Sequence, residues 1–149
     1  MSADNLPATR EQIAALIPHQ GTMCLLDSVR ESTPDTIVCM TRSHASPENP
    51  LRHHGRLSAV HLCEYGAQAM AVHGGLTASA AGLRSRPGLL VALRDVQLSV
   101  AAVEPTGVLE VRAQRIHTTD TASQYEFTIS REGQGLATGR ATIAFRRST

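Results

Sequence analysis

Residues 58–75, SAVHLCEYGAQAMAVHGG, form the stretch that decides the fold. Ser58 has the side chain of an N-cap residue and Gly74-Gly75 supply a left-handed stop, so the pattern predicts a helix over this range. The interior of the helix is apolar nearly all round and consists largely of small residues. Such a helix is buried on most of its sides. Residues 58–75 are therefore expected to form the central helix of the core.

The segments around this helix are mainly β. A short helix capped by Thr9 and ended by Pro18 comes first. Apolar segments predict a strand or hairpin arm over residues 23–29 and strands over 36–41 and 89–100. Alternating apolar residues predict further strands over 108–117, 125–129 and 137–145. Residues 43–55 are a long loop, residues 77–87 a connector, and Gly133-Gln134-Gly135 a hairpin turn. The order predicts an α+β fold, with one long buried helix wrapped by a curved antiparallel meander.

The chain has 149 residues, which is enough for one domain over residues 1–149 and too few for two ordinary domains. One sheet around one helix leaves an edge strand and an apolar rim exposed. Pairing with a second copy buries both, so a homodimer or higher assembly is expected.

Composition excludes several classes of function. All 14 cationic residues are arginine, so chemistry that needs a lysine is excluded. The four aromatic residues Tyr65, Tyr125, Phe127 and Phe145 lie in segments that read as core, and the net charge is only +1. Without stacking platforms or a basic stripe, nucleic acid is not an expected partner.

The three cysteines have no C-x-x-C spacing, and the first residues do not resemble a signal peptide. No apolar run is long enough to span a bilayer. The expected location is the reducing cytoplasm, with no membrane partner.

Glu64 lies in the middle of the apolar helix. Burial raises the pKa of a carboxyl group, and a carboxyl that holds a proton near neutral pH can act as a general acid. Gln68, one turn further on, shares its face and could orient it. The alternative is an ordinary helical glutamate at a solvent edge or paired with an arginine.

Histidines are the second feature. His53 and His54 end the long loop, and a loop histidine beside a helix carboxylate makes an acid/base pair. Alternatively, both are solvated loop residues. His61 and Glu64 form H-x-x-E, but no second ligand motif accompanies it, so neither a metal nor another cofactor is expected.

Two segments resemble a known family. IPHQGTMCLLDSV (17–29) and CEYGAQAM (63–70) are similar to the hotdog-fold 3-hydroxyacyl-acyl-carrier-protein dehydratases, which carry E-x-x-x-Q on the central helix. The similarity is closest to a divergent branch found in aryl-polyene and similar pigment clusters. There G-R-L-P-A often precedes the helix, where this chain has GRLSA (55–59).

The resemblance implies a hotdog fold and dehydration of a 3-hydroxyacyl thioester, on acyl-carrier protein or coenzyme A, to the trans-2-enoyl form. Glu64 matches the helix carboxyl that protonates the departing hydroxyl across the dimer, and Gln68 matches its companion. Ser58 and Ala59 fall where backbone amides polarise the thioester carbonyl. His54 is the first choice, and His53 the second, for the histidine that takes the α proton.

Other readings remain open. Hotdog proteins also include acyl thioesterases, which use a helix carboxylate as base or nucleophile. The G-H-F-P-G signature of the dehydratases is absent, which favours a non-catalytic acyl-binding subunit or a heteromer with another hotdog protein. Arg84, Arg86 and Arg94 are candidate contacts for a phosphopantetheine phosphate or an acidic carrier.

Overall fold

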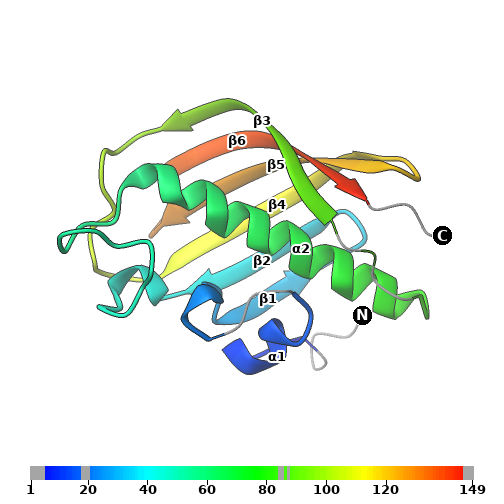
Figure 1. Cartoon of the computed structure of the whole chain (residues 1–149), viewed down its shortest axis with the longest axis horizontal. Coiled ribbons are helices and arrows are strands. Elements are labelled where there is room, and N and C mark those ends of the chain that lie inside the picture. The colour runs from blue at the N-terminus through cyan, green and yellow to red at the C-terminus, as the bar shows by residue number, and fades with distance from the viewer. Residues whose placement is uncertain (1–5, 18–20, 84–85, 87, 146–149) are drawn as a thin grey trace.

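A single long helix lies lengthwise on one face of a six-stranded antiparallel sheet, as Figure 1 shows for the computed structural model. The structure describes residues 6–17, 21–83, 86 and 88–145. The elements are α1 (Arg10–Ala14), η2 (Gly21–Met23), β1 (Ser28–Ser32), β2 (Thr36–Thr41), η3 (Ser43–Ala45), η4 (Ala59–His61), α2 (Leu62–Ala80), β3 (Gly88–Leu98), β4 (Leu109–Thr118), β5 (Ala122–Arg131) and β6 (Gln134–Phe145). The predicted α+β architecture is confirmed.

The sheet order is β1-β2-β4-β5-β6-β3, so the predicted meander is right for β4, β5 and β6 and wrong for β3. Strand β3 pairs with β6 at the edge, with Leu90 opposite Ile143. The connection after β3 is anchored to the segment before α2, because the Val103 N–H donates to the Leu57 carbonyl at 2.9 Å. That anchoring carries the chain across the sheet and prevents a hairpin between β3 and β4.

Helix α2 runs past the predicted stop at Gly74-Gly75 and ends at Ala80, so residues 77–80 are helical rather than connector. Neither glycine has a positive φ. Gly75 packs beside Leu16, but a Cβ there would lie 3.4 Å from Leu16 Cβ, an ordinary van der Waals distance, so the contact does not require glycine. At the other end, the helix is preceded by the 3-10 turn η4, and the side chain of its N-cap residue, Ser58, makes no capping hydrogen bond.

The N-terminal part differs from prediction in one strand. Thr9 caps α1 as expected, accepting from the Gln12 N–H, but the helix ends at Ala14; Pro18 lies outside the described residues. The strand predicted over 23–29 is wrong: β1 begins only at Ser28, after η2 and an irregular stretch. The cause is a tertiary contact. The side chain of Gln68 in α2 forms hydrogen bonds with backbone groups of residues 23–25 that a strand would use. Strand β2 has the predicted bounds.

Phe127 joins the helix to the sheet. A Cβ on Gly66 of α2 would lie 3.0 Å from its ring, and a Cβ on Gly139 of β6 would lie 2.6 Å from it. Glycine at both positions lets the helix settle closely on the sheet. Three of the four aromatic residues are buried as predicted, while Phe145 is only half-buried.

The β5–β6 hairpin turns one residue earlier than predicted. Its two loop residues, Glu132 and Gly133, both have positive φ, 52° and 79°, which is the pattern of a type I′ turn. Gly135 is already part of β6.

Candidate active site

A cavity of about 820 Å³ lies between α2 and the sheet. On the helix it follows a stripe of mostly small residues that includes Glu64, Ala67, Ala71, Gly74 and Ala78. These positions recur at three- and four-residue intervals and so share one face of the helix. Opposite them lie the start of β3 and the ends of β4 and β6, with the start of β5. The small side chains leave this space open.

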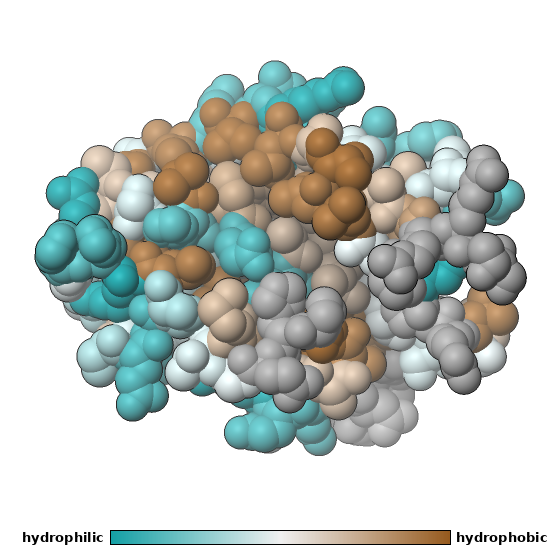
Figure 2. Space-filling model, in the orientation of Figure 1, coloured by the Kyte–Doolittle hydropathy of each residue, from teal (hydrophilic) through white to brown (hydrophobic). Residues whose placement is uncertain are grey.

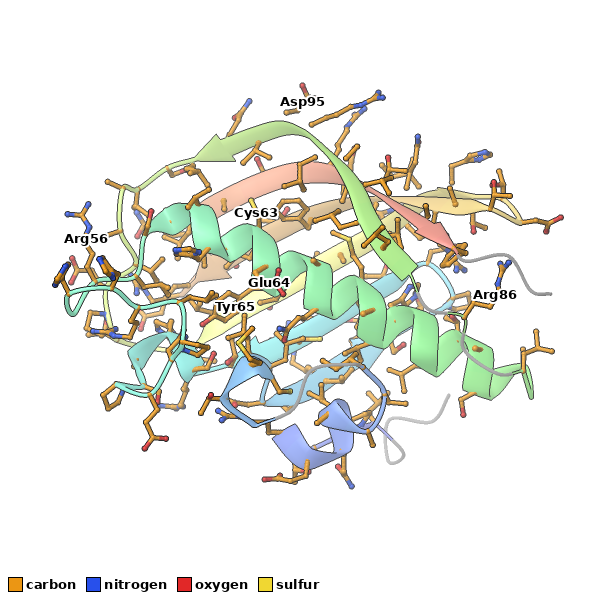
Figure 3. All side chains as sticks on the ribbon, viewed as in Figure 1. Arg56, Cys63, Glu64, Tyr65, Arg86 and Asp95 are labelled. Atoms are coloured by element: carbon orange, nitrogen blue, oxygen red, sulfur yellow. The ribbon has the colours of Figure 1, made fainter. Side chains whose placement is uncertain are left out.

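Glu64 is half-buried and lines the cavity, near the N-terminal end of α2 (Figure 3). It is the one carboxylate among the described residues that line this cavity. The surrounding wall is predominantly aliphatic, so a reacting group placed beside Glu64 would be shielded from much of the solvent.

Gln68, only 1 % exposed, holds the backbone of residues 23–25 against α2. Its Oε1 accepts from the Leu25 N–H at 2.9 Å, and its Nε2 donates to the Met23 carbonyl at 2.8 Å. These bonds explain why residues 23–25 do not join the sheet. Gln68 thus acts on the backbone beside the site.

His53 and His54 lie in a tight turn that is exposed to solvent. His53 and Arg56 form an antiparallel bridge, and His54 and Gly55 between them both have positive φ. Figure 3 shows Arg56 at one end of the molecule, well separated from Glu64. Neither histidine is among the residues that line the cavity, so one chain by itself does not bring them to Glu64.

The long loop 43–55 is ordered by a buried network that the sequence did not reveal. The Tyr65 hydroxyl lies 2.9 Å from Ser43 Oγ and accepts from Asn49 Nδ2 at 3.0 Å. His44, fully buried, places its Nε2 2.8 Å from the Thr106 carbonyl, and burial lowers its pKa. In the sequence, the polar residues Ser43, His44 and Asn49 of this proline-containing loop were the features that could have indicated the network.

Of the two residues expected to polarise a thioester carbonyl, Ala59 already uses its backbone N–H in a hydrogen bond within the protein. The Ala59 N–H donates to the Ala101 carbonyl at 3.0 Å, and Ser58 forms a bridge with Ala102. Both residues tie the start of α2 to the connection that follows β3.

The candidate arginines are not gathered in one place. Arg86 lines the cavity, with its guanidinium 4.7 Å from the centre of the Phe145 ring, while Arg94 lies exposed on β3 opposite Arg140. Figure 3 shows Arg86 at one end of the molecule and Asp95, the neighbour of Arg94, at its top. Arg84 lies outside the described residues, as does His19 of the 17–29 segment.

The end of the cavity beside the C-terminal half of α2 is polar. Tyr125 and Ser123 of β5 line it, and the Tyr125 hydroxyl lies 2.7 Å from Nδ1 of the fully buried His73. Burial raises the pKa of Tyr125 to about 12 and lowers the pKa of His73. The sequence placed Tyr125 in the core. Ser123, at an inward position of the same strand, was the signal that could have shown a polar pocket.

Within the described ranges, no three His, Cys, Asp or Glu side chains are grouped so as to hold a metal ion. In the same part of the chain, no helix is long and apolar enough to cross a membrane. All three cysteines are free and buried, and burial raises the pKa of Cys39 to about 12.

Solved structures define the class. The dehydratase heterocomplex ApeI:P from Xenorhabdus doucetiae matches with a TM-score of 0.83 and 23% identity, over 91% of each chain. Zebra fish thioesterase superfamily member 2 matches at 0.62 and 15%, over 92% of this chain and 95% of that one. A hypothetical thioesterase from Streptococcus pneumoniae TIGR4, solved with coenzyme A, matches at 0.58 and 15%, over 80% and 87%. The chain is a hotdog-fold protein.

The family assignment is narrower than the fold assignment. Residues 11–147 match the model of the ApeP-like family, described as ApeP dehydratase, and the chain belongs to this family. A comparison with curated protein sequences finds no match. The resemblance to the aryl-polyene type of hotdog dehydratase is therefore confirmed.

Proposed function

We propose that the protein removes water from a 3-hydroxyacyl thioester to give the trans-2-enoyl thioester, with Glu64 as the general acid. The observation that carries the proposal is the position of Glu64, a half-buried carboxyl group facing an aliphatic cavity on a dehydratase-family helix. A base takes the α proton, and the electron pair of that C–H bond forms the double bond. The C–O bond breaks as Glu64 protonates the hydroxyl, which leaves as water.

The base is proposed to be His54, or failing that His53, brought by a second chain. Both imidazoles are exposed on the turn and are therefore accessible to a partner. Because one chain keeps them away from its own cavity, the complete site requires two chains. Gln68 positions the backbone of residues 23–25. Ser58 and Ala59 precede α2, and because the Ala59 N–H already donates to the Ala101 carbonyl, the dipole at the N-terminus of α2 is the proposed means of polarising the thioester carbonyl.

Strand β3 is the proposed contact with the second chain. It is an edge strand with exposed large apolar residues on both faces, and Figure 2 shows hydrophobic residues gathered over it. These are Leu89, Val91, Leu93, Val96 and Leu98. Pairing two β3 edges would satisfy their backbone groups and bury these side chains. The second chain is a copy of this one or another hotdog protein.

The substrate is proposed to arrive on acyl-carrier protein or coenzyme A in the cytoplasm. Arg84, Arg86 and Arg94 are the proposed contacts for the phosphate or an acidic carrier surface. Arg86 donates to the Asp120 carbonyl, beside the end of the cavity away from Glu64, so its proposed contact is the carrier surface and not the phosphate of a thioester held in the same cavity. Unchanged affinity for the carrier after substitution of Arg86 and Arg94 would remove that role from those two residues.

The test is an assay of purified protein with 3-hydroxyacyl and enoyl thioesters in both directions, alone and with a co-purified hotdog partner. Enoyl formation is expected, and the His53→Ala/His54→Ala double variant should lose at least about a hundredfold in rate. His117→Ala, an exposed histidine on β4, is the matched control. Full rate in the double variant would remove both histidines from the mechanism.

Two other outcomes would replace the proposal. Release of free thiol with the hydroxyl retained would identify a thioesterase. Inertness of the isolated chain, with turnover by a partner that co-purifies, would identify a non-catalytic subunit. The exposed, separated His53-His54 turn favours that second possibility over the first.

A further inference from the structure

The sheet side of the cavity is lined by polar residues of β4 and β5, Arg115, Thr118, Ser123 and Tyr125, beside apolar residues of β3 and β6. The inward row of β5 is Ser123, Tyr125, Phe127 and Ile129, all buried, and only the first two carry oxygen. On the neighbouring strand β4, the buried Ala113 gives way to Arg115, which lines the cavity. Polar groups are therefore collected beside the C-terminal half of α2, away from Glu64.

Tyr125 has no hydrogen left to donate into the cavity. The Thr33 carbonyl can only accept, so the His73 Nε2, 2.8 Å away, must carry the proton. His73 Nδ1 is then the acceptor, and the Tyr125 hydroxyl donates to it at 2.7 Å. The neighbouring Arg115 guanidinium partly counteracts the rise in the pKa of Tyr125. His73 and Tyr125 thus use their hydrogen bonds mainly to join α2 to the sheet.

The other members of the group retain donors. Thr118 Oγ1 and Ser123 Oγ are 2.7 Å apart, and because each hydroxyl has one hydrogen, this contact uses only one of the two. The Arg115 guanidinium donates to the Pro34 carbonyl at 2.6 Å, which uses only part of its five N–H groups. This end of the cavity therefore retains hydrogen-bond donors.

We propose that Arg115, Thr118 and Ser123 form a subsite for a hydrogen-bond-accepting oxygen at the far end of the acyl chain. The inference rests on the proposed function, because the same cavity must hold the thioester beside Glu64. Between the two ends, the helix side of the wall is apolar, with Ala67, Met70 and Ala71. The ligand class is thus an acyl thioester whose terminus carries a carbonyl, carboxylate or hydroxyl oxygen.

The helix sets the length of this ligand. From Glu64 to Thr77, which lines the polar end, α2 rises about 20 Å. A terminal oxygen reaches the subsite only when the acyl chain spans this distance. Shorter chains would end in the aliphatic section, where a terminal oxygen loses its hydration without a hydrogen bond in return.

Calorimetric titration with amide-linked, non-reactive analogues of acyl-pantetheine tests the subsite without requiring turnover. Three analogues of equal length, ending in a methyl group, a methyl ketone or an ammonium group, are compared in a short and a long series. In the long series the ketone should bind about tenfold tighter than the methyl analogue, and the ammonium analogue should bind most weakly. In the short series the ketone should have no advantage.

Variants assign the effect to the residues. Ser123→Ala combined with Thr118→Val should reduce the ketone-to-methyl ratio toward one, and Ser123→Ala alone, which adds no atoms, should reduce it in part. Thr128→Val, on the outward face of β5, is the matched control and should leave the ratio unchanged.

A wild-type ratio of one in the long series, or an unchanged ratio in both variants, would overturn the subsite. Turnover of the thioesters distinguishes this failure from that of the proposed function. Dehydration without terminal preference would refute only the subsite, whereas preference without dehydration or thioester reaction would refute only the enzymatic role.

Discussion

The two ends of helix α2 carry polar residues in opposite situations. Near the N-terminal end, Glu64 is half-buried and faces a cavity. Toward the C-terminal end, His73 is fully buried, and both of its ring nitrogens have partners in the protein. A fully buried imidazole with both ring nitrogens hydrogen-bonded stabilises the fold, whereas a half-buried carboxyl group that lines a cavity is accessible to a ligand. On the proposed function, the chemistry belongs to the Glu64 end of the helix, and His73 at the other end contributes to stability.

Removing His73 should give the largest loss of stability. His73→Ala creates a cavity and leaves the Tyr125 hydroxyl and the Thr33 carbonyl without their partner, so unfolding free energy should fall by about 3 kcal/mol. Urea unfolding measures it, with the exposed His117→Ala as control. Equal losses in the two variants would remove the structural role assigned to His73.

Substitution of Gln68 tests whether hydrogen bonds near the Glu64 end of α2 also stabilise the fold. Gln68→Leu removes both buried hydrogen bonds to the 23–25 segment and should cost about 2 kcal/mol. Gln97→Leu, at an exposed position of β3, is the control. Hydrogen exchange should also quicken at the Leu25 amide, and unchanged protection there would contradict the anchoring role.

Loosening the packing of Gly139 on Phe127, which lies beneath Gly66 of α2, should cost less stability. In Gly139→Ala the new methyl group meets the Phe127 ring, and the rearrangement should cost about 1.5 kcal/mol. Gly135→Ala, on the same strand with no atom within 4 Å, is the matched control. If the two variants unfold at the same urea concentration, the packing of helix on sheet is looser than described.

The smallest effect is a pH dependence from the His73 end. Burial holds the pKa of His73 below its ordinary 6.5, so the unfolded chain takes up a proton before the folded one. Its contribution to stability is present above pH 6.5 and is lost as pH falls through the folded pKa. Between pH 7 and 6 the loss is at most about 0.7 kcal/mol for this residue. His73→Gln should flatten the curve by that amount, and an identical slope would contradict this origin.

The sequence was sufficient for the architecture and for placing Glu64 on the central helix, because both depend on local pattern. A run of small apolar residues with one carboxylate predicts a buried helix with an unusual polar residue, and the E-x-x-x-Q motif supplied the family. The strand at 36–41 was predicted with the correct bounds because it directly follows the turn residues 32–35 and contains the apolar run Ile37 to Met40.

The errors came from contacts distant in sequence. Gly74-Gly75 is compatible with a helix end or with a helix interior, and in the structure the helix continues through both, with Gly75 beside Leu16 from the N-terminal part of the chain. Residues 23–29 have the composition of a strand, but Gln68 takes their backbone bonds. The polar end of the cavity was missed because Arg115, Ser123 and Tyr125 come together only when β4 and β5 pair.

The rate of water loss in Glu64→Gln, measured beside its unfolding free energy, tests the central claim most directly. Glutamine keeps the shape of the side chain and cannot donate a carboxyl proton. The rate should fall at least about a hundredfold, with stability unchanged. Glu132→Gln, in the β5–β6 turn, should retain both. A Glu64→Gln variant that dehydrates the substrate at the wild-type rate would contradict the account.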